Sequence, residues 1–346
     1  MKEKTALHQF WIKIKDILSR LFARIKKVQV YLYVLVGALV LAVGMGALSY
    51  YLTAQKLGDR PVVAPPTPLP TVHSPLPTAE PTATPSGLCG GRFDVFTDGE
   101  IIQTADEYRT RDIAVFFTEV RESRSEITDK ALVYYVADIY VQNIEDLRAG
   151  LVRGNISGTA PMKKLSQEVG AVVAISGDFA AYRRTGICVR NGQVYRTQVD
   201  ETRDVGILFR DGTMGTFEIG LYTENDVLPL DPWHVWTFGP ELLDESGLSK
   251  DWFNSNVYTR NPRAVFGYYE PGHYCFVMVR GRVKESAGMN LAELSRLMES
   301  LGCTSAFNLD GGGTAQFYWN GETYPGSGGV RNVNDIVYLP LAGGGT

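Results

Sequence analysis

The fold is decided by residues 288–317, which read GMNLAELSRLMESLGCTSAFNLDGGGTAQF. The first part predicts a helix over 291–301, because Asn290 can cap it, Glu293 stands at the capping-box position and Gly302 can end it. Its apolar residues recur at helical spacing and form one stripe: Leu291, Leu294, Leu297, Met298 and Leu301. This is the clearest helix that the chain predicts.

A strand over 303–309 (CTSAFNL) follows this helix and runs into the turn Asp310-Gly311-Gly312-Gly313. Residues 315–319 predict another strand, and Asn320-Gly321 is a dipeptide typical of tight hairpins. The segment therefore predicts a helix, a strand, a glycine turn and a hairpin, in that order.

The preceding residues add more strands than helices. Residues 132–141 (LVYYVADIYV) are rich in aromatic and β-branched side chains, and 171–176 (AVVAIS) read as a buried strand behind a short helix over 161–169. Two more strands, 264–269 and 274–279, flank a turn signal at 270–273. We therefore expect an α+β domain over residues 88–346, built around a mixed, largely hairpin-linked sheet with a few packed helices.

The beginning of the chain predicts a membrane anchor. Residues 31–52 contain no charged residue, and at about 1.5 Å per residue they reach roughly 33 Å, enough to cross a hydrocarbon core of about 30 Å. Residues 1–27 carry eight Lys or Arg against two acidic residues, so we expect residues 1–30 to be cytoplasmic. A cleaved signal peptide is the alternative, although its apolar region is usually shorter.

Residues 53–87 predict a stalk between the anchor and the domain. The part from 61 to 87 is dense in Pro, Thr, Ser and Ala, a composition that favours extended polyproline geometry over a packed core. The expected arrangement is a single-pass protein of the cell membrane whose C-terminal domain lies outside the cytoplasm.

Charge and cysteine content narrow the function classes. The chain has a net charge of −4, and the +6 of residues 1–27 leaves −10 for the rest, which argues against nucleic acid as a partner. The four cysteines, Cys89, Cys188, Cys275 and Cys303, allow up to two disulfides of undecided pairing, or free buried thiols. The four histidines lack the spacing of zinc ligands, so no metal site is predicted.

The turn from Asn308 to Thr314 (NLDGGGT) carries the most chemistry. Glycines allow positive φ and let backbone N–H groups approach a ligand, and successive N–H groups can form a nest for phosphate oxygens. Asp310 at the rim can act as an acid, base, nucleophile or metal ligand. A tight structural turn with a capping Asp is the alternative. The turn is neither a Walker loop nor a dinucleotide fingerprint.

The order of motifs resembles the phosphodiester glycosidase family. The helix, Leu301-Gly302, the Asn308–Thr314 turn, the hairpin and GSGGVRNV at 326–333 resemble its C-terminal signature. Upstream, GAVVAISGDFA (170–180), FGPEL (238–242) and NPRAVFG (261–267) resemble further blocks in the same order. The resemblance covers about residues 90–340.

This resemblance implies a hydrolase that cleaves a sugar-1-phosphodiester. Together with the predicted placement outside the cytoplasm, it points to cell-envelope or exopolysaccharide material as the substrate. Asp310 is then the lead carboxylate, Asp178 its partner, and Arg263 a catalytic residue that clamps the phosphate together with Arg331. Glu241 is a reserve carboxylate. The expected substrate-binding or phosphate-binding residues also include Asn308, Gly311, Gly312, Gly313, Thr314, Ser176 and Gly177. No cofactor is expected, although a single divalent cation on Asp310 and Asp178 stays open.

Three positions depart from the family pattern. The family usually has Asn at the position of Ser176, an aromatic residue at Ala180 and Thr at Ala264. These departures leave open a second reading, a non-catalytic glycan-binding or envelope-assembly protein on the same fold. A third, a metal-dependent phosphodiesterase, lacks the histidines and clustered carboxylates of such sites.

Overall fold

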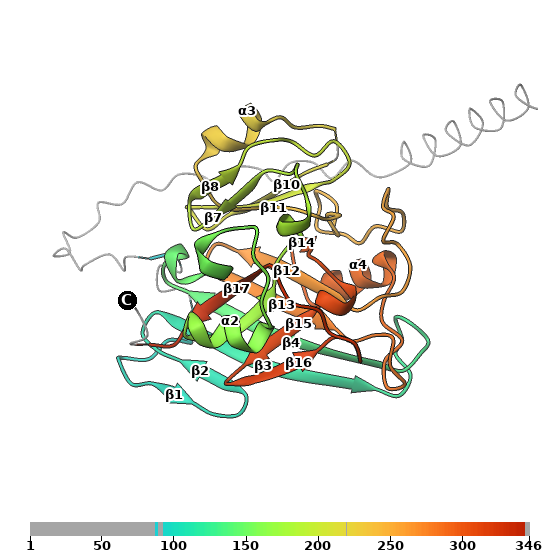
Figure 1. Ribbon diagram of the computed structural model, residues 1–346. Helices are drawn as coiled ribbons and strands as arrows, with labels where there is room; N and C mark the ends of the chain where they lie inside the picture. Colours follow the sequence, from blue (N-terminus) through green and yellow to red (C-terminus); the bar gives the residue numbers. More distant parts are fainter. Residues whose placement is uncertain (1–86, 89–92, 219, 343–346) are drawn as a thin grey trace, which may run out of the picture. The chain divides into compact units, whose positions relative to one another are not determined.

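The computed structural model describes residues 87–88, 93–218 and 220–342 (Figure 1). Across these ranges, no helix has the length and apolar character needed to cross a membrane. The predicted cytoplasmic segment, the anchor at 31–52, the stalk up to residue 86 and Cys89 all lie outside the described residues.

Three sheets make up the described domain (Figure 1). The first sheet has the order β1-β2-β3-β4-β13-β12-β14, the second β16-β15-β6-β17-β5 and the third β10-β9-β11-β7-β8. The strands of the first sheet are β1 (Ile102–Gln103), β2 (Glu107–Arg109), β3 (Ile113–Glu122), β4 (Leu132–Val141), β12 (Arg263–Glu270), β13 (His273–Val279) and β14 (Ser305–Asn308). Those of the second are β5 (Arg148–Leu151), β6 (Ala171–Ser176), β15 (Gln316–Trp319), β16 (Glu322–Pro325) and β17 (Asp335–Pro340). Those of the third are β7 (Cys188–Arg190), β8 (Gln193–Arg196), β9 (Val205–Phe209), β10 (Met214–Phe217) and β11 (Pro232–Thr237).

The α+β class is confirmed, but the expectation of a mixed sheet is wrong. Every strand pair of the described residues is antiparallel. The helix α4 (Leu291–Ser300) connects β13 to β14, yet β12 lies between these two strands, and α2 (Met162–Glu168) connects β5 to β6 with β17 between them. Each crossover thus skips over a strand of opposite direction.

The first two sheets pack face to face and the helices cover their outer faces. Phe266 and Phe276 of the first sheet share a buried cluster with Phe317 and Trp319 of the second. Helix α4 packs its leucine stripe on the other face of the first sheet, and α2 covers the second sheet. The third sheet has its own apolar cluster with α3 (Glu224–Val227). Short 3-10 turns occur at Ile144–Asp146, Val152–Gly154, Ala180–Tyr182, Leu228–Leu230 and Gly312–Thr314.

Local sequence signals placed several elements correctly. The strands at 132–141 and 171–176 have the predicted bounds. The capping box of α4 forms as expected, because the Asn290 side chain accepts from the Glu293 N–H at 2.9 Å and Glu293 accepts from the Asn290 N–H at 2.9 Å. The strand predicted over 303–309 is shorter, since the Cys303 N–H still bonds to the Met298 carbonyl of the helix end.

A buried ion cluster joins the third sheet to the second. The guanidinium of Arg190, on β7, lies 2.6 Å from the carboxylate of Asp335, at the start of β17, and 3.0 Å from that of Asp178, which follows β6. All three side chains are almost completely buried. The guanidinium of Arg190 therefore holds the segment after β6 and the start of β17, both in the second sheet, against the third sheet.

We predict that Arg190→Met lowers the free energy of unfolding by about 3–5 kcal/mol, because it leaves two buried carboxyl groups without their cation. Urea denaturation of the purified chain at neutral pH measures this loss. The matched control is Arg124→Met, which breaks an ion pair with Asp129 whose side chains are 76% and 74% exposed. It should cost less than about 1 kcal/mol. Equal losses in both variants would contradict a structural role for the cluster.

Candidate active site

The glycine turn is held by the strands around it. Asp310 donates its N–H to the Gly177 carbonyl at 3.0 Å, and Gly312 donates to the Pro262 carbonyl at 2.9 Å. A Cβ on Gly311 would lie 2.7 Å from the same Pro262 oxygen, and Gly312 has φ +62°. The turn therefore requires glycine for close backbone approach as well as for its conformation.

The predicted anion nest is only partly available. The Gly312 N–H is bonded to Pro262, and the Thr314 N–H donates to the Gly311 carbonyl at 3.2 Å. These two donors serve the turn itself. The backbone hydrogen bonds therefore stabilise the turn itself and leave fewer N–H groups for an anion than the motif predicts.

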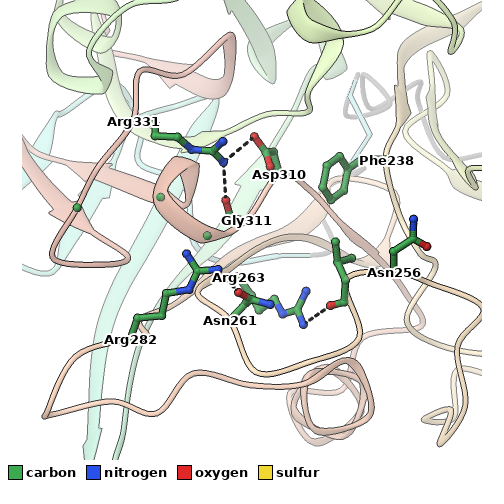
Figure 2. A pocket seen from close by; sticks show the side chains of 12 residues that line it. Phe238, Asn256, Asn261, Arg263, Arg282, Asp310, Gly311 and Arg331 are labelled. Carbon is green, nitrogen blue, oxygen red and sulfur yellow. Dashed lines mark hydrogen bonds and ion pairs between the residues drawn. The ribbon is translucent and has the colours of Figure 1, made fainter.

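A cavity of about 480 Å³ opens beside the turn (Figure 2). Its wall combines the glycine turn with arginines, amides and one aromatic ring; Arg263 stands at the start of β12, and the others lie in loops and turns. The lining residues are Phe238, Asn256, Val257, Asn261, Arg263, Arg282, Asp310, Gly311, Gly312, Gly313, Gly329 and Arg331. Figure 2 shows Arg331 and Arg282 on one side and Phe238 and Asn256 on the other, with Asp310 and Arg263 between them.

Asp310 is the carboxylate of this cavity. Its residue is 6% exposed, and this burial is the main cause that raises the pKa of Asp310 to about 6. A hydrogen bond with the Thr314 side chain and the charges of Arg331 and Arg183 oppose the rise, whereas the charge of Asp178 adds to it. Near neutral pH, Asp310 is therefore poised close to its own titration, as a general base requires.

Arg331 and Arg282 supply accessible positive charge. Arg331 lies 3.9 Å from the Asp310 carboxylate, and its side chain is 56% exposed. The Arg282 guanidinium is exposed and donates to the Asn261 side chain at the cavity wall. Both cations are placed to meet an anion that enters the cavity.

Arg263 lines the cavity but is largely committed to the backbone. Its Nη2 donates to the carbonyls of Val257 at 2.7 Å and Thr259 at 2.6 Å, and its Nε donates to that of Met289 at 3.0 Å. Burial lowers the pKa of Arg263 to about 10. The predicted bidentate phosphate clamp does not fit these contacts, since they use the guanidinium to shape the loop that forms the cavity wall.

Asp178 does not line the cavity, contrary to its predicted place as the second carboxylate. Beside Arg190, it accepts the N–H groups of Ala180 at 2.8 Å and Thr237 at 3.2 Å. It therefore acts on Asp310 through its charge rather than by touching what enters the cavity. The sequence could not show this, because Arg190 stands in no motif and lies on β7, in a different sheet from β6.

Four other predicted site residues do not line the cavity but contact the segments that form it. Asn308 donates to the Gly239 carbonyl at 2.7 Å. The Ser176 hydroxyl accepts the Gln316 N–H at 3.3 Å. Gly177 has no room for a side chain, because a Cβ would lie 2.3 Å from the carboxylate of Asp335. Thr314 is buried and hydrogen-bonds Asp310.

The reserve carboxylate, Glu241, lies away from the cavity. Its side chain accepts from the Thr216 hydroxyl and lies 3.6 Å from the Lys250 ammonium. Burial is the main cause that raises its pKa. These contacts indicate that Glu241 has a structural role next to β10 of the third sheet.

The sequence reasoning missed Arg282 and Asn261, although a signal was present. The strands predicted at 264–269 and 274–279 form a hairpin in which Arg263 pairs with Val279. Asn261, just before Arg263, and Arg282, just after Val279, must then lie close together at the same end of the hairpin. Asn256 had no comparable signal, since it reaches the cavity from a loop; Phe238 opens the FGPEL block but was not singled out as a site residue.

We predict that Asp310→Asn stabilises the protein more at pH 8 than at pH 5. The folded-state pKa of Asp310 lies above its ordinary value of 3.8, so its favourable contribution is full below pH 3.8 and is lost as the pH rises through about 6. The gain of the variant over wild type should grow by about 1.4 kcal/mol between these conditions, measured by urea denaturation.

Thr314→Val serves as the opposite control. It removes a hydrogen bond that favours the charged carboxylate, so the pKa of Asp310 should rise further and the loss of stability above pH 6 should steepen. A stability difference between Asp310→Asn and wild type that is the same at pH 5 and pH 8 would show that Asp310 titrates normally.

Comparison with known proteins identifies a related family and several relatives. The family model described as phosphodiester glycosidase matches residues 169–339. Over 254 residues the chain is 24% identical to the SPbeta prophage-derived uncharacterized protein YomE of Bacillus subtilis (strain 168), covering 70% of this chain and 38% of that protein. Over 186 residues it is 29% identical to N-acetylglucosamine-1-phosphodiester alpha-N-acetylglucosaminidase of Bos taurus, covering 48% of this chain and 35% of the other. The chain thus spans less than two fifths of these relatives.

Solved structures share the fold at low sequence identity. The catalytic domain of zebrafish N-acetylglucosamine-1-phosphodiester alpha-N-acetylglucosaminidase superimposes with a TM-score of 0.53 at 15% identity, covering 70% of this chain and 88% of that one. A hypothetical protein from Synechocystis gives 0.50 at 14% identity, covering 66% and 62%. Residues 169–339, which contain the glycine turn and most of the cavity wall, thus match the family model of the phosphodiester glycosidases.

Proposed function

We propose that this protein hydrolyses a sugar-1-phosphodiester, releasing the sugar from a phosphorylated acceptor. The observation that carries the proposal is the single buried carboxylate, Asp310, in a cavity whose opposite charges are the guanidinium groups of Arg282 and Arg331. The match to the family model and the N-acetylglucosamine-1-phosphodiester substrate in the name of the bovine relative support the same reaction class.

One carboxylate in the cavity is sufficient for this chemistry. Most glycosidases need a second carboxyl group to protonate the leaving oxygen. A phosphodiester leaves as a weakly basic phosphate anion, so it needs little protonation and benefits mainly from nearby positive charge. Asp310 then either attacks the anomeric carbon or takes a proton from the attacking water. Both roles require its ionised form.

Arg282 and Arg331 are proposed to bind the phosphate group. Their exposed guanidinium groups can donate to phosphate oxygens and balance the charge that grows as the sugar–oxygen bond breaks. Arg263 is proposed to keep the Val257–Thr259 carbonyls in place, which holds the wall against which the substrate lies.

The proposed reaction uses no cofactor. The remaining option from the sequence was one divalent cation shared by Asp310 and Asp178. Asp178 already accepts two amide N–H groups and lies beside Arg190, so its oxygens are poorly placed to ligate a cation with Asp310. We therefore propose metal-independent hydrolysis.

Catalysis is favoured over the alternative of glycan binding without turnover. That alternative was motivated by the departures at Ser176 and Ala180 from the family pattern. Both residues are buried, and neither lines the cavity. The departures therefore leave the residues around the proposed reacting atoms unchanged.

We also propose that the domain acts outside the cytoplasm, tethered to the membrane through residues 31–52. The support is the uncharged apolar run, the basic segment before it and the Pro-rich stalk after it. An extended stalk of about 27 residues at about 3.1 Å each reaches roughly 80 Å, so the proposed substrate is cell-envelope or exopolysaccharide material.

We predict that Asp310→Asn lowers kcat by about 10³-fold on the methyl diester of N-acetylglucosamine 1-phosphate, because the carboxylate takes part in the reaction. Arg282→Met and Arg331→Met should each lower kcat/KM by roughly 10–100-fold, since a charged phosphate contact is lost. Release of N-acetylglucosamine, measured by chromatography with a chelator present, reports all three variants.

The surface variant Arg124→Met should keep the wild-type rate. For wild type, kcat/KM should rise with pH and level off above about pH 6, as Asp310 ionises. Full activity of Asp310→Asn would refute the assigned role, and loss of activity in the chelator would refute the metal-independent reaction.

We predict that the full chain remains in the membrane fraction after alkaline carbonate extraction, because a spanning apolar helix is not released by charge disruption. Deletion of residues 31–52 should move the protein to the soluble fraction. Mass spectrometry of the mature N-terminus provides the control. An N-terminus beyond residue 47 would show a cleaved signal peptide in place of the anchor.

A further inference from the structure

Two further hollows adjoin the active-site cavity. Phe238 and Asn256 line this cavity and also a narrow neighbouring hollow that contains Arg203. Pro240 and Asn254 line that hollow and also a third cavity of about 190 Å³. The shared residues place the three spaces next to one another in a row that leads away from Asp310, and this row is called the groove below.

An exposed aromatic ring stands at the far end of this groove. Trp252 is 75% exposed and lines the third cavity with Phe253 and Lys250. Tryptophan is usually well covered in folded proteins, and its exposure leaves a large apolar surface in water. A single exposed apolar residue is ordinary, but this one lies in the groove that starts at the active site.

The loop that carries Trp252 is fixed at both ends. The Lys250 N–H donates to the Ser295 hydroxyl of α4 at 2.8 Å, and its ammonium lies 5.7 Å from the centre of the Phe253 ring. At the other end, Arg263 donates to the carbonyls of Val257 and Thr259. Since Arg263 also lines the active-site cavity, the same guanidinium positions the site and the groove.

The chemistry of the groove fits a saccharide chain. The exposed amides Asn254 and Asn256 lie between Trp252 and the active site, and amides can donate to and accept from sugar hydroxyls. A flat aromatic ring covers the apolar C–H face of a pyranose, as aromatic rings do at sites with one apolar and one wet side. A purely apolar partner would leave the amides unpaired.

We propose that this groove is an extended glycan subsite with Trp252 as its distal platform. The substrate is then an oligosaccharide or polysaccharide chain that bears the phosphodiester, rather than a single sugar. This inference rests on the proposed hydrolysis of a sugar-1-phosphodiester and names the substrate class of the same site.

The test compares short and long substrates on the full chain. The short probe is the methyl diester of N-acetylglucosamine 1-phosphate. Two long probes carry a tetrasaccharide of N-acetylglucosamine, one on the sugar side and one as the alcohol of the phosphate. At least one long probe should show about tenfold higher kcat/KM than the short probe.

Trp252→Ala should bring the ratio of long to short kcat/KM close to one, mainly through a higher KM for the long probe. Ile101→Ala is the matched control, because Ile101 is also exposed (53%) and lies outside the groove. It should keep the wild-type ratio. Equal rates for short and long probes in wild type, or an unchanged ratio in Trp252→Ala, would overturn the subsite.

A binding measurement separates this inference from the proposed reaction. If no probe is hydrolysed, the proposed function fails, and calorimetry with the free tetrasaccharide then decides on the groove. Binding to wild type and to Ile101→Ala that is lost in Trp252→Ala supports the glycan subsite. Absence of binding to wild type overturns it.

Discussion

The structure depends on one buried guanidinium. Arg190 lies between the carboxylates of Asp178 and Asp335, at the point where the third sheet meets the second. Two buried carboxylates would repel each other and lose their hydration, so this junction is stable only with the cation in place. The segments that follow β6 and precede β17 are thereby fixed, and the glycine turn hydrogen-bonds to the first of them through Asp310 and Gly177.

The same arrangement prepares the chemistry of the cavity. Burial is the main cause that raises the pKa of Asp310, and the charge of Asp178 adds to it. A carboxylate with an ordinary pKa would hold on to fewer protons and be a weaker base at neutral pH. In the proposed reaction, this unfavourable buried charge makes Asp310 a stronger base at the expense of stability, which is the common relation between active sites and stability.

Much of the fold followed from local pattern. The alternation of apolar residues in β4, the apolar run of β6 and the capping box of α4 each depend on neighbours within a few residues, and each was placed with accurate bounds. The sheet arrangement was less accessible. Whether neighbouring strands run parallel or antiparallel depends on which strand inserts between the two strands that a helix connects. That inserted strand can be distant along the chain, as β17 is from β5 and β6.

The sequence alone determined the α+β class, the glycine turn with Asp310 as its carboxylate, and the family to which the turn points. Only the tertiary structure decided which charged residues meet there. Asp178 and Arg263 stood in motifs, yet burial beside Arg190 and beside backbone carbonyls engages them in support. Arg282 and Asn256 stood in none, yet chain folding brings them to the cavity. The physical reason is that a residue's role depends on its partners and exposure, which spacing along the chain does not specify.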